Sequence, residues 1–212
     1  MTENQKLILD GPADSALTVI FAHGAGAPMD SPFMAAFAEG LGKQGWQVVR
    51  FEFSYMAERR QTGKRRPPSP QARLLNEWRD VLASVNHPGK KLVIGGKSMG
   101  GRMASLLADE SQVNGLVCLG YPFHPPGKPE KLRTEHLAEL STPALFVQGT
   151  RDALGSRDEI EGYRLAPGIR FHWAEDGDHS LKPRKASGFT EAGHWQAGID
   201  AIDQFLRGIL RS

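Results

Sequence analysis

Short apolar segments separated by stretches of helical periodicity constrain the fold of this chain more than any other feature. The apolar segments are residues 17–22, 47–53, 91–95, 115–120, 144–149 and 169–173. Most are nearly continuous apolar runs, as is typical of strands covered on both faces. Between them, apolar residues recur at helical spacing, most clearly over 74–85 and 195–209. This alternation predicts an α/β fold, a three-layer α/β/α sandwich around a mostly parallel sheet.

The length of the chain, 212 residues, suits one such domain. We therefore expect a single domain over residues 1–212 with no room for a separate lid. Hydrophobic residues make up 40% of the chain and charged residues 24%, which excludes a disordered protein.

Cysteine content and hydropathy indicate the compartment. The one cysteine, Cys118, rules out a disulfide framework, and its apolar neighbours predict a buried thiol. The chain contains no run of 18 apolar residues and no apolar signal region near residue 1, so we expect no membrane span and a cytoplasmic location.

A glycine-rich turn follows the expected strand at 91–95. Gly96, Ser98 and Gly100 form a Gly-x-Ser-x-Gly pattern, and a helical stretch comes next. In a strand–turn–helix context this is the pattern of a nucleophile elbow. The sharp turn leaves no space for side chains two residues before and after the serine, which explains both glycines. A glycine-rich turn with a solvated serine is the alternative interpretation.

A serine nucleophile needs a base, and the base needs an orienting acid. In sheets of this type the order along the chain is Ser, then Asp or Glu, then His, each on a loop after a strand. Asp152 follows the strand at 144–149, and His179 follows the strand at 169–173. We therefore predict a catalytic triad of Ser98, Asp152 and His179.

Several other residues compete for these roles. His124 follows the strand at 115–120 and is an alternative base, while Asp176 and Asp178 flank His179 and are alternative orienting acids. His172 lies inside an expected strand and is interpreted as structural. His194 lies inside an expected helix and is interpreted as a surface or packing residue. The other histidines are His23, His87 and His136.

The loop at residues 23–28 follows the first long strand and consists mostly of small residues. Such a loop lets main-chain amides approach a ligand closely, and in folds with a nucleophile elbow it is where a second oxyanion donor is expected. We predict the amides of Ala25 and Met99 as the oxyanion hole. His23 is expected to brace the loop.

Residues 54–73 carry six basic residues against one acid, although the whole chain has a net charge of only +2. Three prolines within 67–70 predict an extended loop. This loop and the segment 121–128 leave the carboxyl ends of strands, so we expect them to form the pocket walls. The candidate substrate-binding residues are Arg59, Arg60, Lys64, Arg65, Arg66, Tyr121 and His124.

The positive charge allows three interpretations. Arginines suit recognition of a carboxylate or phosphate on the substrate. A nucleic-acid or protein contact is a second interpretation, and a solvated loop is the third. Lys97, beside the nucleophile, either adds positive potential or pairs with an acid.

The chain resembles the α/β-hydrolase superfamily, most closely its small capless members near dienelactone hydrolase. The resemblance rests on the order along the chain of His23-Gly24, the segment 96–101, Asp152 and His179. More narrowly, the segments 96–102 and 121–128 resemble the α/β-hydrolase-like family named after testis-expressed proteins and a subunit of the NSL acetyltransferase complex. The chain differs from dienelactone hydrolases because it has serine, not cysteine, as the nucleophile.

The resemblance implies a serine hydrolase that cleaves a small ester or thioester through an acyl-enzyme, with no metal or organic cofactor. An anionic substrate is a hypothesis that rests on the basic segment. No nucleic-acid or membrane partner is expected. The main alternative is an interaction module on a hydrolase scaffold that contacts its partner through residues 59–66. A peptidase is disfavoured, because peptidases of this fold usually carry a gating domain.

Overall fold

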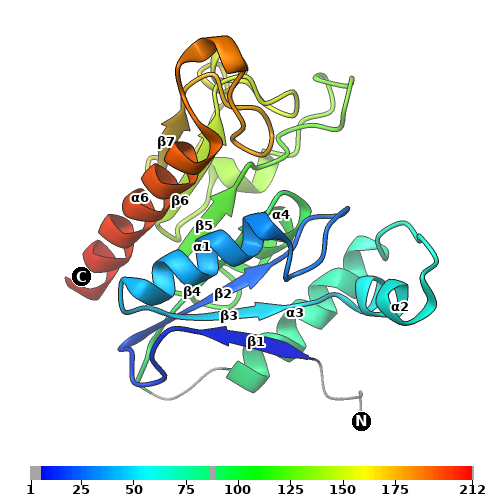
Figure 1. Cartoon of the computed structure of the whole chain (residues 1–212), viewed down its shortest axis with the longest axis vertical. Helices are drawn as coiled ribbons and strands as arrows, with labels where there is room; N and C mark the ends of the chain where they lie inside the picture. Colours follow the sequence, from blue (N-terminus) through cyan, green and yellow to red (C-terminus); the bar gives the residue numbers. More distant parts are fainter. Residues whose placement is uncertain (1–5, 86–88, 212) are drawn as a thin grey trace.

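The computed structural model describes residues 6–85 and 89–211 and has a seven-stranded sheet at its centre (Figure 1). The strands are β1 (Leu7–Asp10), β2 (Leu17–Ala22), β3 (Gln47–Phe51), β4 (Lys91–Lys97), β5 (Gly115–Leu119), β6 (Ala144–Gly149) and β7 (Ile169–Ala174). Their order is β1-β3-β2-β4-β5-β6-β7, and every neighbouring pair is parallel except β1 with β3. The predicted mostly parallel sheet is confirmed.

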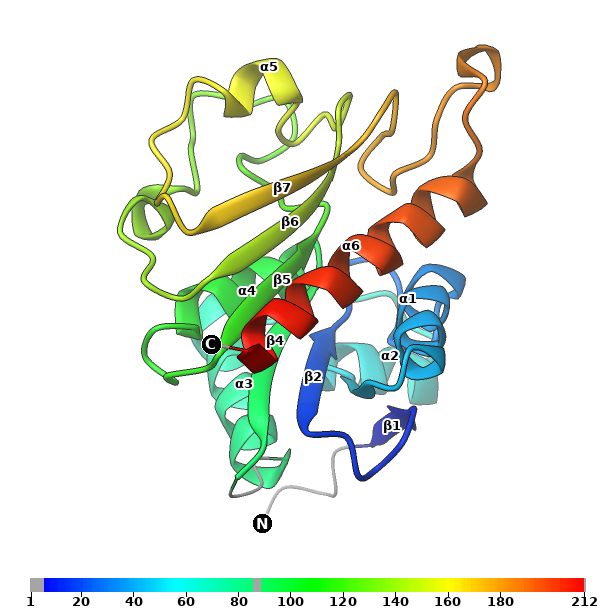
Figure 2. The same ribbon diagram turned by 90° about the vertical axis from the view of Figure 1, so that its left-hand side faces the viewer.

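Helices cover both faces of this sheet (Figures 1 and 2). On one face lie α1 (Pro32–Lys43) and α6 (Glu191–Arg211), and on the other α3 (Gln71–Val85) and α4 (Met99–Leu107). The remaining helical segments are α2 (Ser54–Thr62), α5 (Arg157–Ile160) and the 3-10 turns Glu135–Ala138 and Lys185–Ser187. The predicted three-layer α/β/α sandwich is therefore correct. Among the described helices, none combines the length and apolar character of a membrane span.

The central strand β2 shows why the strands read as continuous apolar runs. Successive side chains of a strand point to opposite faces. Leu17, Val19 and Phe21 pack into the layer of α1 and α6, whereas Ile20 and Ala22 pack into the layer of α3 and α4. All five are fully buried. Two covered faces therefore remove the polar alternation of a half-exposed strand.

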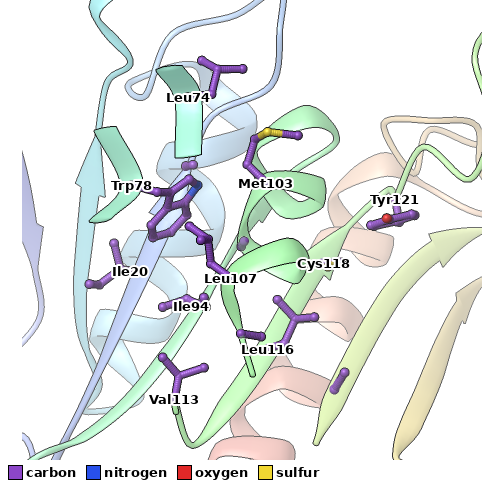
Figure 3. Close-up of a cluster of buried hydrophobic side chains, with 14 of the residues drawn as sticks. Ile20, Leu74, Trp78, Ile94, Met103, Leu107, Val113, Leu116, Cys118 and Tyr121 are labelled. Carbon is purple, nitrogen blue, oxygen red and sulfur yellow. The ribbon is translucent and has the colours of Figure 1, made fainter. Parts of the chain in front are cut away.

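The core beneath α3 and α4 is built around Trp78 (Figure 3). Its indole is fully buried beside Leu107 of α4 and meets the ring of Phe51 edge to face, with ring centroids 4.7 Å apart. Cys118 lies in the same cluster, and burial raises the pKa of its thiol. The predicted buried thiol is confirmed.

Residues 54–62 correct the sequence-based expectation, because they form α2 rather than an extended loop. Tyr55 and Met56 are buried and supply packing that the weak amphipathic pattern of this segment did not indicate. Gly63, with φ of 68°, ends the helix, and only residues 63–70 have no regular secondary structure. The edge strand β1 was not predicted, because it is short and Leu9 is 64% exposed.

Candidate active site

Three side chains from separate loops meet at the carboxyl ends of the strands. Ser98 follows β4, Asp152 follows β6 and His179 follows β7. The His179 Nε2 lies 2.8 Å from the Ser98 Oγ, and its Nδ1 lies 2.8 Å from an Asp152 carboxylate oxygen. Asp152 is fully buried, and the imidazole is 29% exposed. The three residues chosen from the sequence therefore form one hydrogen-bonded chain.

The turn that carries Ser98 has the steric constraints expected of an elbow. Ser98 itself has φ of 51° and ψ of −114°, which is strained for a residue with a side chain. A Cβ on Gly96 would lie 2.1 Å from the Ala22 carbonyl oxygen, and one on Gly100 would lie 2.4 Å from the same atom. Glycine is needed at both positions because β4 and α4 pass directly against the end of β2.

The Asp152 carboxylate is held in one orientation by three donors. One oxygen accepts hydrogen bonds from the His179 Nδ1–H and from the Gln148 Nε2 at 2.9 Å. The other accepts from the Leu154 amide at 2.8 Å. Gln148 is fixed in turn, because its Oε1 accepts from the Tyr121 amide at 2.7 Å. With Nδ1–H donating to the acid, Nε2 is left to accept the serine proton.

Of the two residues predicted to form the oxyanion hole, Ala25 borders the cavity and Met99 directly follows Ser98 in the chain. Met99 is the first residue of α4, where main-chain N–H groups lack a helical partner. Ala25 lines a cavity together with Ser98. Within the described part of the chain, neither amide donates a hydrogen bond. Both remain available to an anion that forms beside Ser98.

His23 braces the loop that carries Ala25. Its Nδ1 lies 2.6 Å from the Gly24 carbonyl oxygen, and its Nε2 accepts a hydrogen bond from the Phe53 amide at 3.1 Å. Burial lowers the pKa of this imidazole, so the ring is neutral. The structural role predicted for His23 agrees with these contacts.

A cavity of about 530 Å³ opens beside Ser98 and His179. Its wall is formed by the loop after β2, the start of α1 and two residues of α6. Phe33 and Trp195 meet edge to face there, with ring centroids 5.5 Å apart. Lys97 and Glu191 are the charged residues of the wall, apart from the imidazole. The space suits a small ligand with an apolar part.

The two segments predicted as pocket walls do not line this cavity. Tyr121 is fully buried, and its hydroxyl donates to the Arg133 carbonyl oxygen at 3.0 Å. His124 is also buried, with Nδ1 at 3.0 Å from the Pro125 carbonyl oxygen and Nε2 facing Glu159 at 3.4 Å. The chain after β5 turns both side chains into the core, so substrate binding by Tyr121 and His124 is not supported at this cavity.

Arg59 and Arg60 also have partners within the chain. Arg59 donates to the Gly26 carbonyl oxygen at 3.2 Å. Arg60 forms an ion pair with Glu52 at 2.8 Å and another with Asp30. These contacts connect α2 to the loop after β2, so the two arginines support the candidate oxyanion loop from behind. The predicted role in substrate binding is not supported at this cavity.

The rest of the predicted basic set lies further away. Arg66 forms an ion pair with Glu58 at 3.0 Å. Lys64 and Arg65 are exposed on the extended segment, and neither lines the cavity. Much of the local positive charge is thus balanced by acids of the same chain.

The alternative orienting acids are engaged elsewhere. Asp176 pairs with Arg151 at 2.8 Å and with a second arginine, which lowers the pKa of its carboxyl to about 2. The Asp178 carboxylate accepts from the amide of Lys182 at 3.0 Å and closes the turn that carries His179. The imidazole therefore contacts the acid predicted as its partner.

The other histidines are held by structural contacts. The His194 Nδ1 lies 2.7 Å from the Leu181 carbonyl oxygen, and His172 is half-buried in β7, so both are structural, as predicted. His136 contacts a serine of α4, and burial lowers its pKa to about 4. His87 lies outside the described residues. Among the described residues, no group of three or more His, Cys, Asp or Glu is arranged to hold a metal ion.

Some residues of the site were not identified from the sequence. Gln148 is a lone polar residue in the apolar run of β6, and that signal could have revealed its contact with the acid. Phe33 and Trp195 gave no signal, because apolar positions on amphipathic helices usually belong to the core. Lys97 was expected to add positive potential or to pair with an acid; its ammonium instead donates a hydrogen bond to the His179 carbonyl oxygen.

Comparison with known proteins agrees with this fold. The family model described as "Alpha/beta hydrolase domain" matches residues 15–207. The chain therefore belongs to the alpha/beta hydrolase family.

Solved structures show the same fold at low sequence identity. Est1E of Butyrivibrio proteoclasticus is 14% identical with a TM-score of 0.70, over 97% of this chain and 94% of that one. A serine hydrolase without a lid from Xanthomonas campestris is 18% identical with a TM-score of 0.65, over 97% and 87%. Dienelactone hydrolase of Anabaena variabilis is 21% identical with a TM-score of 0.65, over 99% and 92%. The resemblance to the testis-expressed subfamily stays a prediction.

Proposed function

We propose that this protein is a serine hydrolase that cleaves a small carboxylic ester or thioester. The observation that carries the proposal is the hydrogen-bonded chain from Ser98 through His179 to Asp152, with 2.8 Å at each step, at the edge of an open cavity. This arrangement supplies a nucleophile, a general base and an orienting acid in hydrogen-bonding geometry.

Acylation follows from the roles of these atoms. The Ser98 Oγ attacks the carbonyl carbon while its proton moves to the His179 Nε2, and Asp152 stabilises the imidazolium that forms. The carbonyl oxygen becomes an oxyanion, which accepts hydrogen bonds from the amides of Ala25 and Met99. Loss of one such donor typically costs about 10²–10³-fold in rate. The intermediate collapses when the imidazolium protonates the departing alcohol or thiol.

Deacylation uses the same groups in a second cycle. A water molecule loses its proton to the His179 Nε2 and attacks the acyl carbon of the ester formed with Ser98. The imidazolium then returns the proton to the serine oxygen and releases a carboxylic acid. This scheme accounts for every proton with residues of the chain, and no step requires a metal or organic cofactor.

The cavity supports a substrate of modest size with an apolar part. Its volume of about 530 Å³ lies in the range of small-molecule sites, and Phe33 and Trp195 offer ring faces and edges to a ligand. One similar structure is of Est1E with ferulic acid bound. We infer an ester or thioester with an apolar acyl or alcohol group, and the test substrates include aryl esters for this reason.

The interaction module on a hydrolase scaffold is the weaker candidate. Its proposed contact surface is residues 59–66, where Arg59, Arg60 and Arg66 contact acids or a carbonyl group of the chain itself. Lys64 and Arg65 are exposed and form no ion pair with the described residues. The site geometry favours catalysis.

The decisive experiment measures hydrolysis of p-nitrophenyl acetate, butyrate and octanoate, together with a matched thioester. We expect turnover by the wild-type protein and a loss of about 10⁴-fold or more in kcat for Ser98→Ala. Ser84→Ala on the exposed side of α3 is the matched control and should retain full activity. Equal hydrolysis by Ser98→Ala and the wild type would contradict the proposal.

A further inference from the structure

Lys97 is next to the nucleophile in the chain and contacts the main chain of the residue that supplies the base. It is the last residue of β4 and precedes Ser98, and it lines the cavity. Its ammonium donates a hydrogen bond to the main-chain carbonyl oxygen of His179, 82 positions further along the chain. The Nζ also lies 5.3 Å from the centroid of the Phe33 ring. The side chain thus connects the end of β4 to the loop after β7.

Gly120 provides the space for this connection. It follows β5, which lies next to β4 in the sheet, and has φ of 62°. A Cβ on Gly120 would lie 2.5 Å from the His179 carbonyl oxygen and 2.7 Å from the Lys97 Nζ. The ammonium and the carbonyl group therefore meet directly above the Gly120 backbone, in the space that any side chain would fill.

The free-energy cost of an ammonium at this position indicates that it has a role. Burial disfavours the charged form and lowers the pKa of Lys97 to about 8, although the carboxylates of Asp152 and Asp178 favour the charge. Among the described residues, no carboxylate is within ion-pair distance of this ammonium. An apolar side chain such as methionine would pack against Phe33 without this cost, so packing alone does not explain a lysine.

The carbonyl contact gives His179 a third anchor. The imidazole is held on its two ring nitrogens by Ser98 and Asp152, and the contact with Ser98 changes as the proton moves. The hydrogen bond from Lys97 holds the main chain of the same residue and does not take part in proton transfer. It therefore keeps the base in place when the contact with the serine changes.

We infer that Lys97 is a positioning residue, which holds the His179 carbonyl group over Gly120 and so keeps the imidazole aligned between Ser98 and Asp152. The inference rests on the proposed hydrolase function and adds to it a fourth side chain and a glycine. Displacement of a catalytic group by about 1 Å can cost about 10²-fold in rate, so the loss of this anchor should appear in kcat rather than in KM.

The charge of Lys97 makes a second readout possible. The titratable groups that face its ammonium are Asp152, Asp178 and the His179 ring, with Glu191 on the same cavity wall. Above a pH of about 8 the amine becomes neutral, because its pKa is lowered to about 8, and a neutral amine is the weaker donor. The wild-type pH profile of kcat should therefore fall on the alkaline side with a midpoint near this value.

The experiment compares the wild type with Lys97→Met and Lys97→Arg, on the best p-nitrophenyl ester and from pH 5 to 10. Background hydrolysis by Ser98→Ala is subtracted at each pH. We expect Lys97→Met to lower kcat by about 10–100-fold with KM changed less than threefold. Lys97→Arg, which keeps a cation, should recover part of kcat and lack the alkaline decline near pH 8. Lys43→Met, an exposed residue of α1, is the matched control and should behave as the wild type.

Gly120→Ala disturbs the same contact, because its Cβ would occupy the space where the ammonium and the carbonyl group meet. This variant keeps the ammonium. It should lower kcat similarly, and the double variant with Lys97→Met should lose little more than either single variant. Because Lys97→Arg retains the charge, its pH profile tests the inference even where Lys97→Met or Gly120→Ala fails to fold.

Two results are distinguishable. An active wild type, with Lys97→Met within twofold in kcat and an unchanged alkaline limb in Lys97→Arg, overturns the role of Lys97 and leaves the hydrolase proposal intact. A folded wild-type protein that hydrolyses no ester or thioester overturns both.

Discussion

Replacement of Asp152 by asparagine tests how the buried acid supports the base. The carboxylate is fully buried and accepts three hydrogen bonds, from His179, Gln148 and the Leu154 amide. An asparagine side chain has one acceptor oxygen and one donor group in place of the two acceptor oxygens of the carboxylate. In either orientation of the amide, its NH₂ group faces at least one donor, so a buried N–H loses its partner.

The expected magnitude follows from these contacts. Leaving a buried donor unpaired costs about 1–3 kcal/mol, and a hydrogen bond to a charged group contributes about 1.5–3 kcal/mol. The amide also lacks the negative charge that stabilises the imidazolium. If the NH₂ group faces the ring, the imidazole takes the tautomer with its proton on Nε2, which cannot accept from Ser98. Together these effects amount to about 5 kcal/mol in the transition state, or about 10⁴-fold in kcat/KM.

The assay compares kcat/KM of Asp152→Asn with that of the wild type on the same p-nitrophenyl ester. The rate measured with Ser98→Ala defines the background. Asp200→Asn, an exposed position on α6, is the matched control and should retain activity within twofold. Urea unfolding confirms that each variant is folded. A folded Asp152→Asn protein that loses less than tenfold would refute the assignment of Asp152 as the orienting acid.

Three further predictions concern the scaffold and the cavity. Gly100→Ala should destabilise the fold by about 3 kcal/mol in urea unfolding, since its Cβ would overlap a carbonyl oxygen at 2.4 Å, whereas Gly208→Ala, in open space on α6, should stabilise it by about 0.5–1 kcal/mol. Trp195→Ala should raise KM for p-nitrophenyl esters about tenfold while leaving kcat nearly unchanged; an equal rise for alkyl esters that contain no aromatic ring would argue against an aromatic wall. The pKa of His136 is lowered to about 4, so the unfolded chain binds its proton first and stability falls as pH drops from about 6.5 to 4. Urea midpoints across that range should decline less steeply in His136→Gln; identical slopes would contradict this.

The strands and the candidate triad could be predicted because topology links them. Strands covered on both faces leave apolar runs, and β2 and β6 coincide with the predicted segments. Parallel strands end at one edge, so residues just after those runs must lie near each other. That constraint brought Ser98, Asp152 and His179 together without knowledge of any contact.

The walls of the cavity could not be predicted in the same way. Phe33 and Trp195 lie on helices, and whether an apolar helical position meets the core or a cavity depends on where the helix begins relative to the sheet edge. Tyr121 follows a strand, as the triad residues do, but its ring packs into the core and its hydroxyl finds the Arg133 carbonyl group. The position of a residue in the sequence indicates the sheet edge but not the direction of the side chain.

Covalent labelling tests the central claim most directly. The folded protein is treated with a fluorophosphonate probe, and the modified residue is located by mass spectrometry of proteolytic peptides. The account predicts one adduct, on the Ser98 oxygen, which is absent from Ser98→Ala and forms far more slowly in Asp152→Asn. A folded wild-type protein that stays unlabelled, or that carries the adduct on another residue, would contradict it.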